Sequence, residues 1–296
     1  MLPRDNVLPI EDSGRVLDGH DRRIGTILFE AGKLRSADIE RILGEQRLKG
    51  VKFGEAALSL GLVTVEDLRV AVARQYDLPH VLPGSESVSG ELVVAYEPFH
   101  PRAEEIRALR TQLLIRWANA GVKHRVLAVV SPGAGEGRSY VAANLAVVFS
   151  QLGERTLLID ADLRVPRQHR IFNVPDRLGL SAVLSGRADR GALVPVSEFG
   201  RLSLLPAGAL PPNPQDLLSR PAFAALLEEL KAEFDVIFFD TPPAKPYADA
   251  QSVAYRAGSA IVIARKDRTP VVDTTGVIRQ LSDTGARIVG TVFNAF

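Results

Sequence analysis

The sequence contains no cysteine, and it has one methionine, one tryptophan and 6% aromatic residues in total. Without cysteine it can form no disulfide, no thiolate zinc site and no cysteine nucleophile. It also has no apolar run near the roughly 18–20 residues that span a bilayer. Its first residues have no apolar core like that of a secretory signal. We therefore expect any association with a membrane to come only through a partner.

An excess of charge of either sign is also missing. Lysine and arginine number 36 against 35 acidic residues, which gives a formal net charge of +1. This balance gives no support to a nucleic-acid partner. Apolar residues make up 46% and charged residues 24%, which is typical of globular proteins. The 296 residues are enough for about two domains.

A repeat follows a lead-in of mixed charge over residues 1–22. We place a tandem helical repeat over residues 23–93, in which each copy is predicted to be a helix, a turn and a second helix. Gly32 and Gly61 are predicted to end the first helix of each copy, and Ser36 and Thr64 to cap the second. The matching pairs, all 29 positions apart, are Arg23 and Lys52, Ile24 and Phe53, Gly25 and Gly54, Gly32 and Gly61, Leu34 and Val63, Ile39 and Leu68, Leu43 and Val72, and Gln46 and Gln75.

This duplicated pattern resembles the N-terminal domain of type II secretion and pilus assembly ATPases (the MshE/GspE N-terminal type), in which two such motifs bind cyclic di-GMP. In the second copy a lysine replaces the arginine, and Lys33 takes an apolar position of the first copy. A small helical docking module fits the same pattern, so both interpretations stay open. The resemblance implies cyclic di-GMP contacts from Arg23, Gly25, Gln46, Lys52, Gly54 and Gln75.

A phosphate-binding loop is predicted in a second domain, residues 97–296. A buried strand over 125–130 leads into the glycine-rich segment 131–139 and then a helix. Glycines let backbone N–H groups converge on phosphate oxygens, and the helix N-terminus favours an anion. Ser139 stands where a hydroxyl would bind Mg²⁺. Two residues depart from the usual pattern, because Pro132 replaces the first glycine and Arg138 replaces the lysine.

Three aspartates follow two further apolar strands. Asp160 and Asp162 end the run that begins at Leu157, and Asp240 ends the apolar strand of the segment 235–243. Carboxylates at the carboxyl ends of parallel strands lie where open α/β sheets bind ligands. Together with Ser139 they predict a magnesium site. Further strands are expected at 201–205, 259–264 and 287–293, which predicts an α/β P-loop NTPase with a mostly parallel sheet flanked by helices.

These segments resemble bacterial tyrosine kinases of the polysaccharide-export type, within the MinD/Mrp branch of P-loop proteins. LLIDADLR matches the second acidic motif of that family, and FDVIFFDTPP matches its Walker B motif. Glu104, Arg107 and Arg110 match its ExxRxxR oligomerisation motif, although ordinary surface charges on one helix face would explain that match as well. Taken with the repeat, the match points to the EpsG type of chain-length-determinant kinase.

The resemblance implies an ATP- and Mg²⁺-dependent tyrosine autokinase that controls exopolysaccharide chain length, polymerisation and export. It implies a cytoplasmic, self-associating protein held at the inner membrane by a transmembrane polysaccharide co-polymerase. Asp160 and Asp162 would position Mg²⁺, with one acting as base, while Asp240 would order metal-bound water. Arg138 would act on the phosphates in catalysis. The implied nucleotide contacts are Gly133, Gly135, Glu136, Gly137, Arg138, Ser139, Tyr140 and Asn294, the last toward adenine.

Two alternatives remain. Positioning ATPases of the MinD/ParA kind carry a signature lysine early in the loop, where this sequence has Gly133. A nucleotide-sensing regulator that transfers no phosphate would also fit, because Arg138 replaces the usual lysine. Family kinases commonly end in a tyrosine-rich tail, whereas here Phe296 follows closely on Asn294, so the phosphoacceptor is left open.

Overall fold

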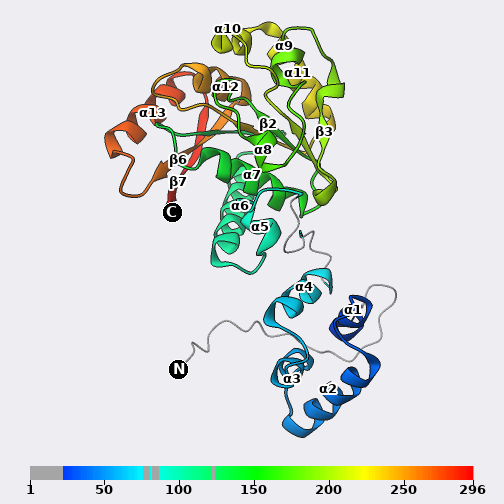
Figure 1. Ribbon diagram of the computed structural model, residues 1–296. Coiled ribbons are helices and arrows are strands. Elements are labelled where there is room, and N and C mark those ends of the chain that lie inside the picture. The colour runs from blue at the N-terminus through cyan, green and yellow to red at the C-terminus, as the bar shows by residue number, and fades with distance from the viewer. Residues whose placement is uncertain (1–22, 76–80, 82–86, 122–123, 296) are drawn as a thin grey trace. The chain divides into compact units, whose positions relative to one another are not determined.

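The computed structural model describes residues 23–75, 81, 87–121 and 124–295, and the lead-in expected at 1–22 lies outside them (Figure 1). The chain divides into two compact units, Met1–Pro79 and His80–Phe296. No helix among the described residues has the length and apolar character needed to cross a membrane.

The first unit consists of the two predicted helix pairs. They are α1 (Ile24–Glu30), α2 (Ser36–Lys49), α3 (Phe53–Ser59) and α4 (Val65–Gln75). The copies interlock, because α1 packs against α4 and α2 against α3. Their apolar faces form one core that includes Leu28, Ile42 and Ala57. An ion pair of 2.8 Å between Lys33 Nζ and Asp67 Oδ1 joins the copies, which accounts for a lysine at a position that the repeat pattern makes apolar.

The helix ends confirm three of the four predicted signals. Gly32 and Gly61 have φ of 69° and 65°, the left-handed conformation that glycine adopts without strain. Thr64 caps α4, since its Oγ1 accepts from the N–H of Asp67 at 3.1 Å. The cap predicted at Ser36 is wrong. Ser36 is the first helical residue, and the N-cap is Arg35, whose N–H donates to the Asp38 carboxylate at 3.0 Å.

The second unit has a seven-stranded sheet in the order β3-β4-β2-β5-β1-β6-β7. All pairs are parallel except β3 with β4, which confirms the predicted mostly parallel α/β fold. The strands are β1 (Arg125–Val130), β2 (Thr156–Asp160), β3 (Val194–Pro195), β4 (Leu202–Leu205), β5 (Val236–Asp240), β6 (Ser259–Arg265) and β7 (Arg287–Asn294). The helices are α5 (Val93–Tyr96), α6 (Pro101–Asn119), α7 (Arg138–Ser150), α8 (Gln168–Ile171), α9 (Leu180–Leu184), α10 (Pro214–Ser219), α11 (Pro221–Glu233), α12 (Asp249–Ala257) and α13 (Val271–Asp283), with 3-10 turns at Arg190–Ala192 and Ser197–Phe199.

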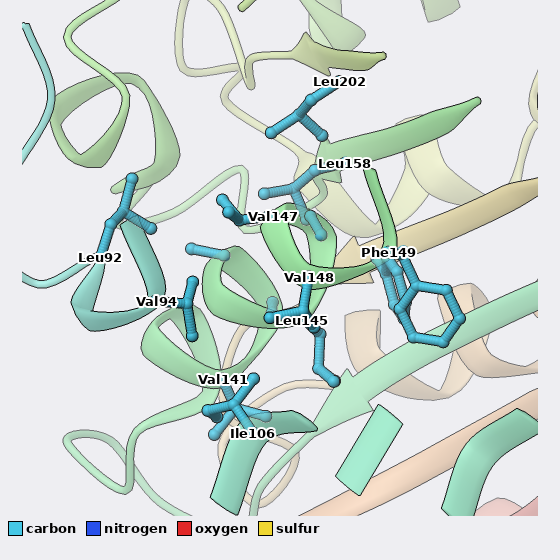
Figure 2. Packing of buried hydrophobic residues seen from close by; sticks show 14 of the residues in the cluster. Leu92, Val94, Ile106, Val141, Leu145, Val147, Val148, Phe149, Leu158 and Leu202 are labelled. Carbon is cyan, nitrogen blue, oxygen red and sulfur yellow. The ribbon is translucent and has the colours of Figure 1, made fainter. Parts of the chain in front are cut away.

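Helices cover both faces of the sheet, so the central strands are apolar on both sides. Alternate residues point to opposite faces: Leu158 and Phe238 belong to the core that contains α5, α6 and α7. Ile159 and Phe239 belong to the core that contains α10 to α13. Helix α7 is buried along almost its whole length, and Figure 2 shows its apolar side chains meeting those of the neighbouring segments. The helix that follows the loop is therefore held firmly in place.

The segment before α6 packs with the second unit. The side chains of Leu92 and Val94 face α7 in Figure 2, and both are fully buried. Asn144 of α7 accepts from the N–H of Val94 at 3.3 Å and donates to the carbonyl of Glu91 at 3.0 Å. The sequence had placed residues up to 93 in the repeat. Their apolar side chains instead complete the core over α7.

Candidate active site

Three neighbouring strands bring the loop and the aspartates to one edge of the sheet. β5 lies between β2 and β1, and Asp160 and Asp240 are register partners at the ends of β2 and β5. The loop 131–137 continues from β1 and enters α7 at Arg138. Strand order thus places Asp160 beside Asp240, at the edge of the sheet where the loop leads into α7 and Ser139.

Buried side chains hold the loop in shape. Gly135 and Gly137 have positive φ of 71° and 97°, which explains why these positions need glycine. Glu136 is buried, and its carboxylate accepts from the N–H of Gly133 at 2.8 Å and from the Thr269 hydroxyl at 2.6 Å. Asn294 donates to the Glu136 carbonyl at 3.0 Å, so the last strand reaches the loop. The Glu136 side chain acts as a brace of the loop.

Arg138 folds inward and contacts the protein. Its Nε donates to the Thr241 carbonyl at 2.5 Å, and its Nη1 donates to Ser131 Oγ at 2.6 Å and to the Gly133 carbonyl at 3.0 Å. Its Nη2 lies 3.7 Å from Asp162 Oδ2. Only 7% of the residue is exposed. A planar guanidinium makes these contacts as a fork, which a lysine ammonium cannot reproduce.

The two aspartates after β2 organise the turn that follows. Asp160 accepts from the N–H of Asp162 at 3.2 Å through Oδ1, and from the N–H of Arg167 and Gln168 at 3.1 and 3.0 Å through Oδ2. Asp162 Oδ1 accepts from the N–H of Arg164 at 3.1 Å and of Val165 at 2.9 Å. Both carboxylates thus fix the backbone around the site, in addition to any part in binding metal.

Gln168 is a site residue that the sequence reasoning missed. Its Nε2 donates to Asp240 Oδ2 at 2.8 Å and to the Ser139 carbonyl at 3.1 Å, and the side chain is fully buried. The other oxygen of Asp240 and the Oε1 of Gln168 are buried without a partner. Such unpaired buried acceptors are costly unless something supplies donors. No local pattern signals this residue, because its contact with Asp240 spans 72 positions.

Burial sets the electrostatics of the site. Burial, and then the neighbouring Asp240 charge, raise the pKa of Asp160 well above its usual range. Burial also raises the pKa of Asp240, although Arg138 and the Ser139 hydroxyl act to lower it. Buried acids close together resist full ionisation until a cation joins them. This edge of the sheet therefore favours the binding of a cation.

The described residues contain no ready-made cluster of three acids or histidines that encloses a metal. Magnesium does not need one, because it keeps several waters and takes one or two carboxylates along with substrate phosphates. The unpartnered Oδ1 of Asp240 and the hydroxyl of Ser139, the second residue of α7, suit such an ion. The donor set thus fits hydrated Mg²⁺.

Glu104, Arg107 and Arg110 lie on α6, and they make contacts within the chain. Glu104 pairs with Arg107, which also donates to the Pro98 carbonyl at 2.6 Å. Arg110 donates to the Val148 carbonyl of α7 at 3.1 Å. Burial lowers the pKa of Arg110. Tyr140 is half-buried on α7, and burial raises the pKa of its hydroxyl.

The residues implied for cyclic di-GMP all belong to the first unit. A Cβ at Gly25 would lie 3.0 Å from the Phe53 ring, and one at Gly54 would lie 3.2 Å from Leu68, so both glycines permit close helix packing. Gln46 donates weakly to the Val51 carbonyl at 3.4 Å, and Lys52 N–H donates to Glu55. The Arg23 side chain is exposed, whereas Gln75 Oε1 is buried without a partner.

Comparison with known proteins identifies the family of this chain. Residues 121–295 match the family model of ParA, described as NUBPL iron-transfer P-loop NTPase. The tyrosine-protein kinase YwqD of Bacillus subtilis is 34% identical over 203 residues, which cover 69% of this chain and 85% of YwqD. The chain belongs to the bacterial tyrosine-protein kinase family, within the ParA-like P-loop proteins. Some curated relatives are much longer than the matched region, which covers 26% of the putative tyrosine-protein kinase EpsB of Ralstonia solanacearum but 91% of the putative tyrosine-protein kinase CapB of Staphylococcus aureus.

Solved structures of this family have the same fold. The kinase domain of the Escherichia coli tyrosine kinase ETK is 28% identical, with a TM-score of 0.67, over 71% of this chain and 82% of that domain. The septum site-determining protein MinD of Pyrococcus horikoshii, complexed with Mg-ADP, is 26% identical with a TM-score of 0.51, over 57% of this chain and 70% of MinD. The residues matched by the family model, 121–295, all lie in the second unit.

Proposed function

We propose that the protein is an ATP- and Mg²⁺-dependent protein-tyrosine autokinase that regulates exopolysaccharide chain length, polymerisation and export. One observation carries the kinase assignment. Asp160, Asp162 and Asp240 stand around a glycine-rich loop in a family whose members are tyrosine-protein kinases. Phosphoryl transfer depends mainly on positioning and on neutralising charge, and this arrangement supplies both.

Each side chain has a role in this reaction. The loop N–H groups and the α7 N-terminus would hold the phosphates, and Ser139 and Asp240 would hold hydrated Mg²⁺. The ion would neutralise charge on the phosphates. Asp160 would keep the turn after β2 in place. Asp162 would accept the proton of the tyrosine hydroxyl, because its Oδ2 is the carboxylate oxygen left free by the turn.

The cellular role rests on the resemblance to chain-length-determinant kinases. That resemblance implies that the partner is a transmembrane polysaccharide co-polymerase, which would hold the cytoplasmic protein at the inner membrane. It also implies that the protein self-associates through Glu104, Arg107 and Arg110. The first unit would act as the sensor that couples output to cyclic di-GMP. The pseudo-symmetric pairing of its two copies suits a ligand with two guanines and two phosphates.

A single-turnover assay with radiolabelled ATP tests the kinase. We expect phosphotyrosine on the full chain, more of it when the cytoplasmic segment of the co-polymerase is added, and none in Asp162→Asn. An Asp216→Asn variant is the control, because Asp216 lies exposed on α10. Tight nucleotide binding without any phosphotyrosine would contradict the proposal.

That outcome would favour a second function, a nucleotide-sensing regulator that transfers no phosphate. The observation that favours it concerns Arg138, because its guanidinium hydrogen-bonds Ser131, Gly133 and Thr241 within the protein. Nucleotide would then change the shape of the loop and of its binding surfaces without chemistry. Only the formation of phosphotyrosine distinguishes the two functions, because a kinase and a nucleotide sensor both bind ATP.

A further inference from the structure

A basic cavity lies beside the catalytic carboxylates. Its volume is about 540 Å³, and it is lined by the turn after β2, by α8, by the segment before α9 and by the segment after β4. Three arginines contribute to its wall, against one aspartate. They are Arg164, Arg170 and Arg177. Arg164 ends the LLIDADLR motif, whereas Arg170 and Arg177 lie outside every motif described above.

Two of the three arginines have no ion-pair partner among the described residues. Arg164 is held by Asp249 at 2.6 Å and stacks over the Tyr247 ring at 3.7 Å. Arg170 and Arg177 are exposed and have no ion-pair partner in the described part of the chain. Exposed guanidiniums gathered at one cavity attract carboxylates and offer them paired donors.

The wall of the cavity is preformed. Gly179 has no side chain, and a Cβ there would lie 2.1 Å from the Pro206 carbonyl oxygen, so only glycine allows this close approach. The approach lets the N–H of Leu180 donate to that carbonyl at 2.8 Å. Gly208, which lies against Gly179 and lines the cavity, adopts a positive φ of 76°. Binding here would need little ordering of backbone.

Residues that line the cavity also hydrogen-bond an aspartate that follows β2. The N–H groups of Arg164 and Val165, which line it, are the donors that hold Asp162 Oδ1. His169, also in the wall, follows Gln168, which binds Asp240. Whatever occupies the cavity therefore lies next to the groups that we assign to phosphoryl transfer.

The geometry points to this cavity as the docking site for acidic residues that flank the acceptor tyrosine. The inference rests on the proposed kinase function and names its preferred substrate. Carboxylates of the acceptor segment would pair with Arg170 and Arg177, while its tyrosine reaches toward Asp162. Val165, 71% exposed, and Leu210, 59% exposed, give the lining an apolar part that suits a peptide better than a bare phosphate.

The test separates docking from chemistry. The probe is a fluorescent peptide with a single tyrosine among glutamates, and its binding to the full chain is measured by anisotropy without ATP. We expect the double variant Arg170→Glu/Arg177→Glu to weaken binding about tenfold or more. The same variant should raise the KM for the peptide while the affinity for ATP stays unchanged. A peptide with glutamine in place of glutamate should bind the wild type weakly.

The matched control is Arg201→Glu/Arg287→Glu. It makes the same change of charge at the start of β4 and β7, the opposite edge of the sheet from Asp162. An equal loss of binding in both double variants would show that only the net charge of the protein matters, and it would overturn the inference. Complete displacement of the peptide by millimolar inorganic phosphate would also overturn it, in favour of a simple anion site. Peptide binding without phosphotyrosine would refute the kinase and keep the docking site.

Discussion

Arg138 Nε donates to the carbonyl oxygen of Thr241 at 2.5 Å, which ties the phosphate-binding loop to the segment after β5. A lysine at this position would lose that bond and those to Ser131 and Gly133, but would free a compact charge for the phosphates. We expect Arg138→Lys to leave ATP affinity similar, to raise turnover and to lower the free energy of unfolding by about 1–3 kcal/mol.

Single-turnover phosphorylation and denaturant titration measure the two effects. Arg125→Lys is the control, since it weakens the pair with Glu154, where β1 starts, and should change stability without changing turnover. Loss of turnover in Arg138→Lys would show that the guanidinium itself is required.

Gln168 should act as a positioning residue for Asp240. Replacing it with leucine keeps the volume but removes the donor to Asp240 Oδ2 and to the Ser139 carbonyl. Partners of metal-binding groups commonly contribute 10–100-fold, so we expect kcat to fall at least about tenfold. The Mg²⁺ concentration for half-maximal rate should rise, whereas the KM for ATP should change less.

Gln215→Leu on the exposed side of α10 is the control for Gln168→Leu. An unchanged Mg²⁺ dependence in Gln168→Leu would assign the residue to packing alone.

The sequence predicted much of the fold but only part of the site. Strand ends could be read because an apolar run followed by aspartate or by glycines is a local pattern, and β1 was predicted with its observed bounds. The inward turn of Arg138 and the contact of Gln168 depend on strand order, which pairs distant segments. The cap predicted at Ser36 was wrong because the helix begins one residue earlier than expected. The Asp38 carboxylate accepts from the N–H of Arg35, which makes Arg35 the N-cap and Ser36 the first helical residue.

Asp240 should make the nucleotide-free protein less stable as pH rises. Its pKa is raised in the fold, so the folded state binds protons more readily than the unfolded one, and stability falls between the ordinary carboxyl pKa and the raised value. Asp240→Asn removes this cost. We expect it to abolish turnover and to raise the Tm at neutral pH by about 2–4 °C, a gain that shrinks toward pH 4.

Asp235, at the other end of β5, gives a control of opposite sign. Its hydrogen bonds with Arg155 lower its pKa to about 2, so it stabilises the fold above the ordinary carboxyl pKa. Asp235→Asn should therefore lower the Tm at neutral pH, and this loss should fade as the pH falls toward 2. Parallel pH trends in the two variants, measured by calorimetry, would contradict the assignment.

Self-association should depend on Glu104. Reversal of Arg110 would also break its bond to the Val148 carbonyl, so Glu104→Lys is the cleaner variant. The Glu104 side chain is 64% exposed. If this face of α6 enters a neighbouring subunit, the variant should shift the mass toward monomer in light scattering with ATP present. Glu105→Lys on the same helix is the control, and identical mass distributions for both variants and the wild type would refute an interface at this motif.

Cyclic di-GMP should bind the first unit through Arg23, whose exposed guanidinium can form paired hydrogen bonds with guanine or phosphate. Lys52, at the matching place in the second copy, supplies only a point charge, so we expect weaker binding than in a site with two arginines. Substitution of Gly25 cannot separate ligand contact from packing, because a Cβ would meet Phe53 at 3.0 Å. Calorimetry on the full chain should therefore compare Arg23→Ala with Arg47→Ala, an exposed arginine on α2. Heat that disappears only in Arg23→Ala supports the sensor, whereas no heat from the wild type at high micromolar ligand would leave the repeat as a docking module.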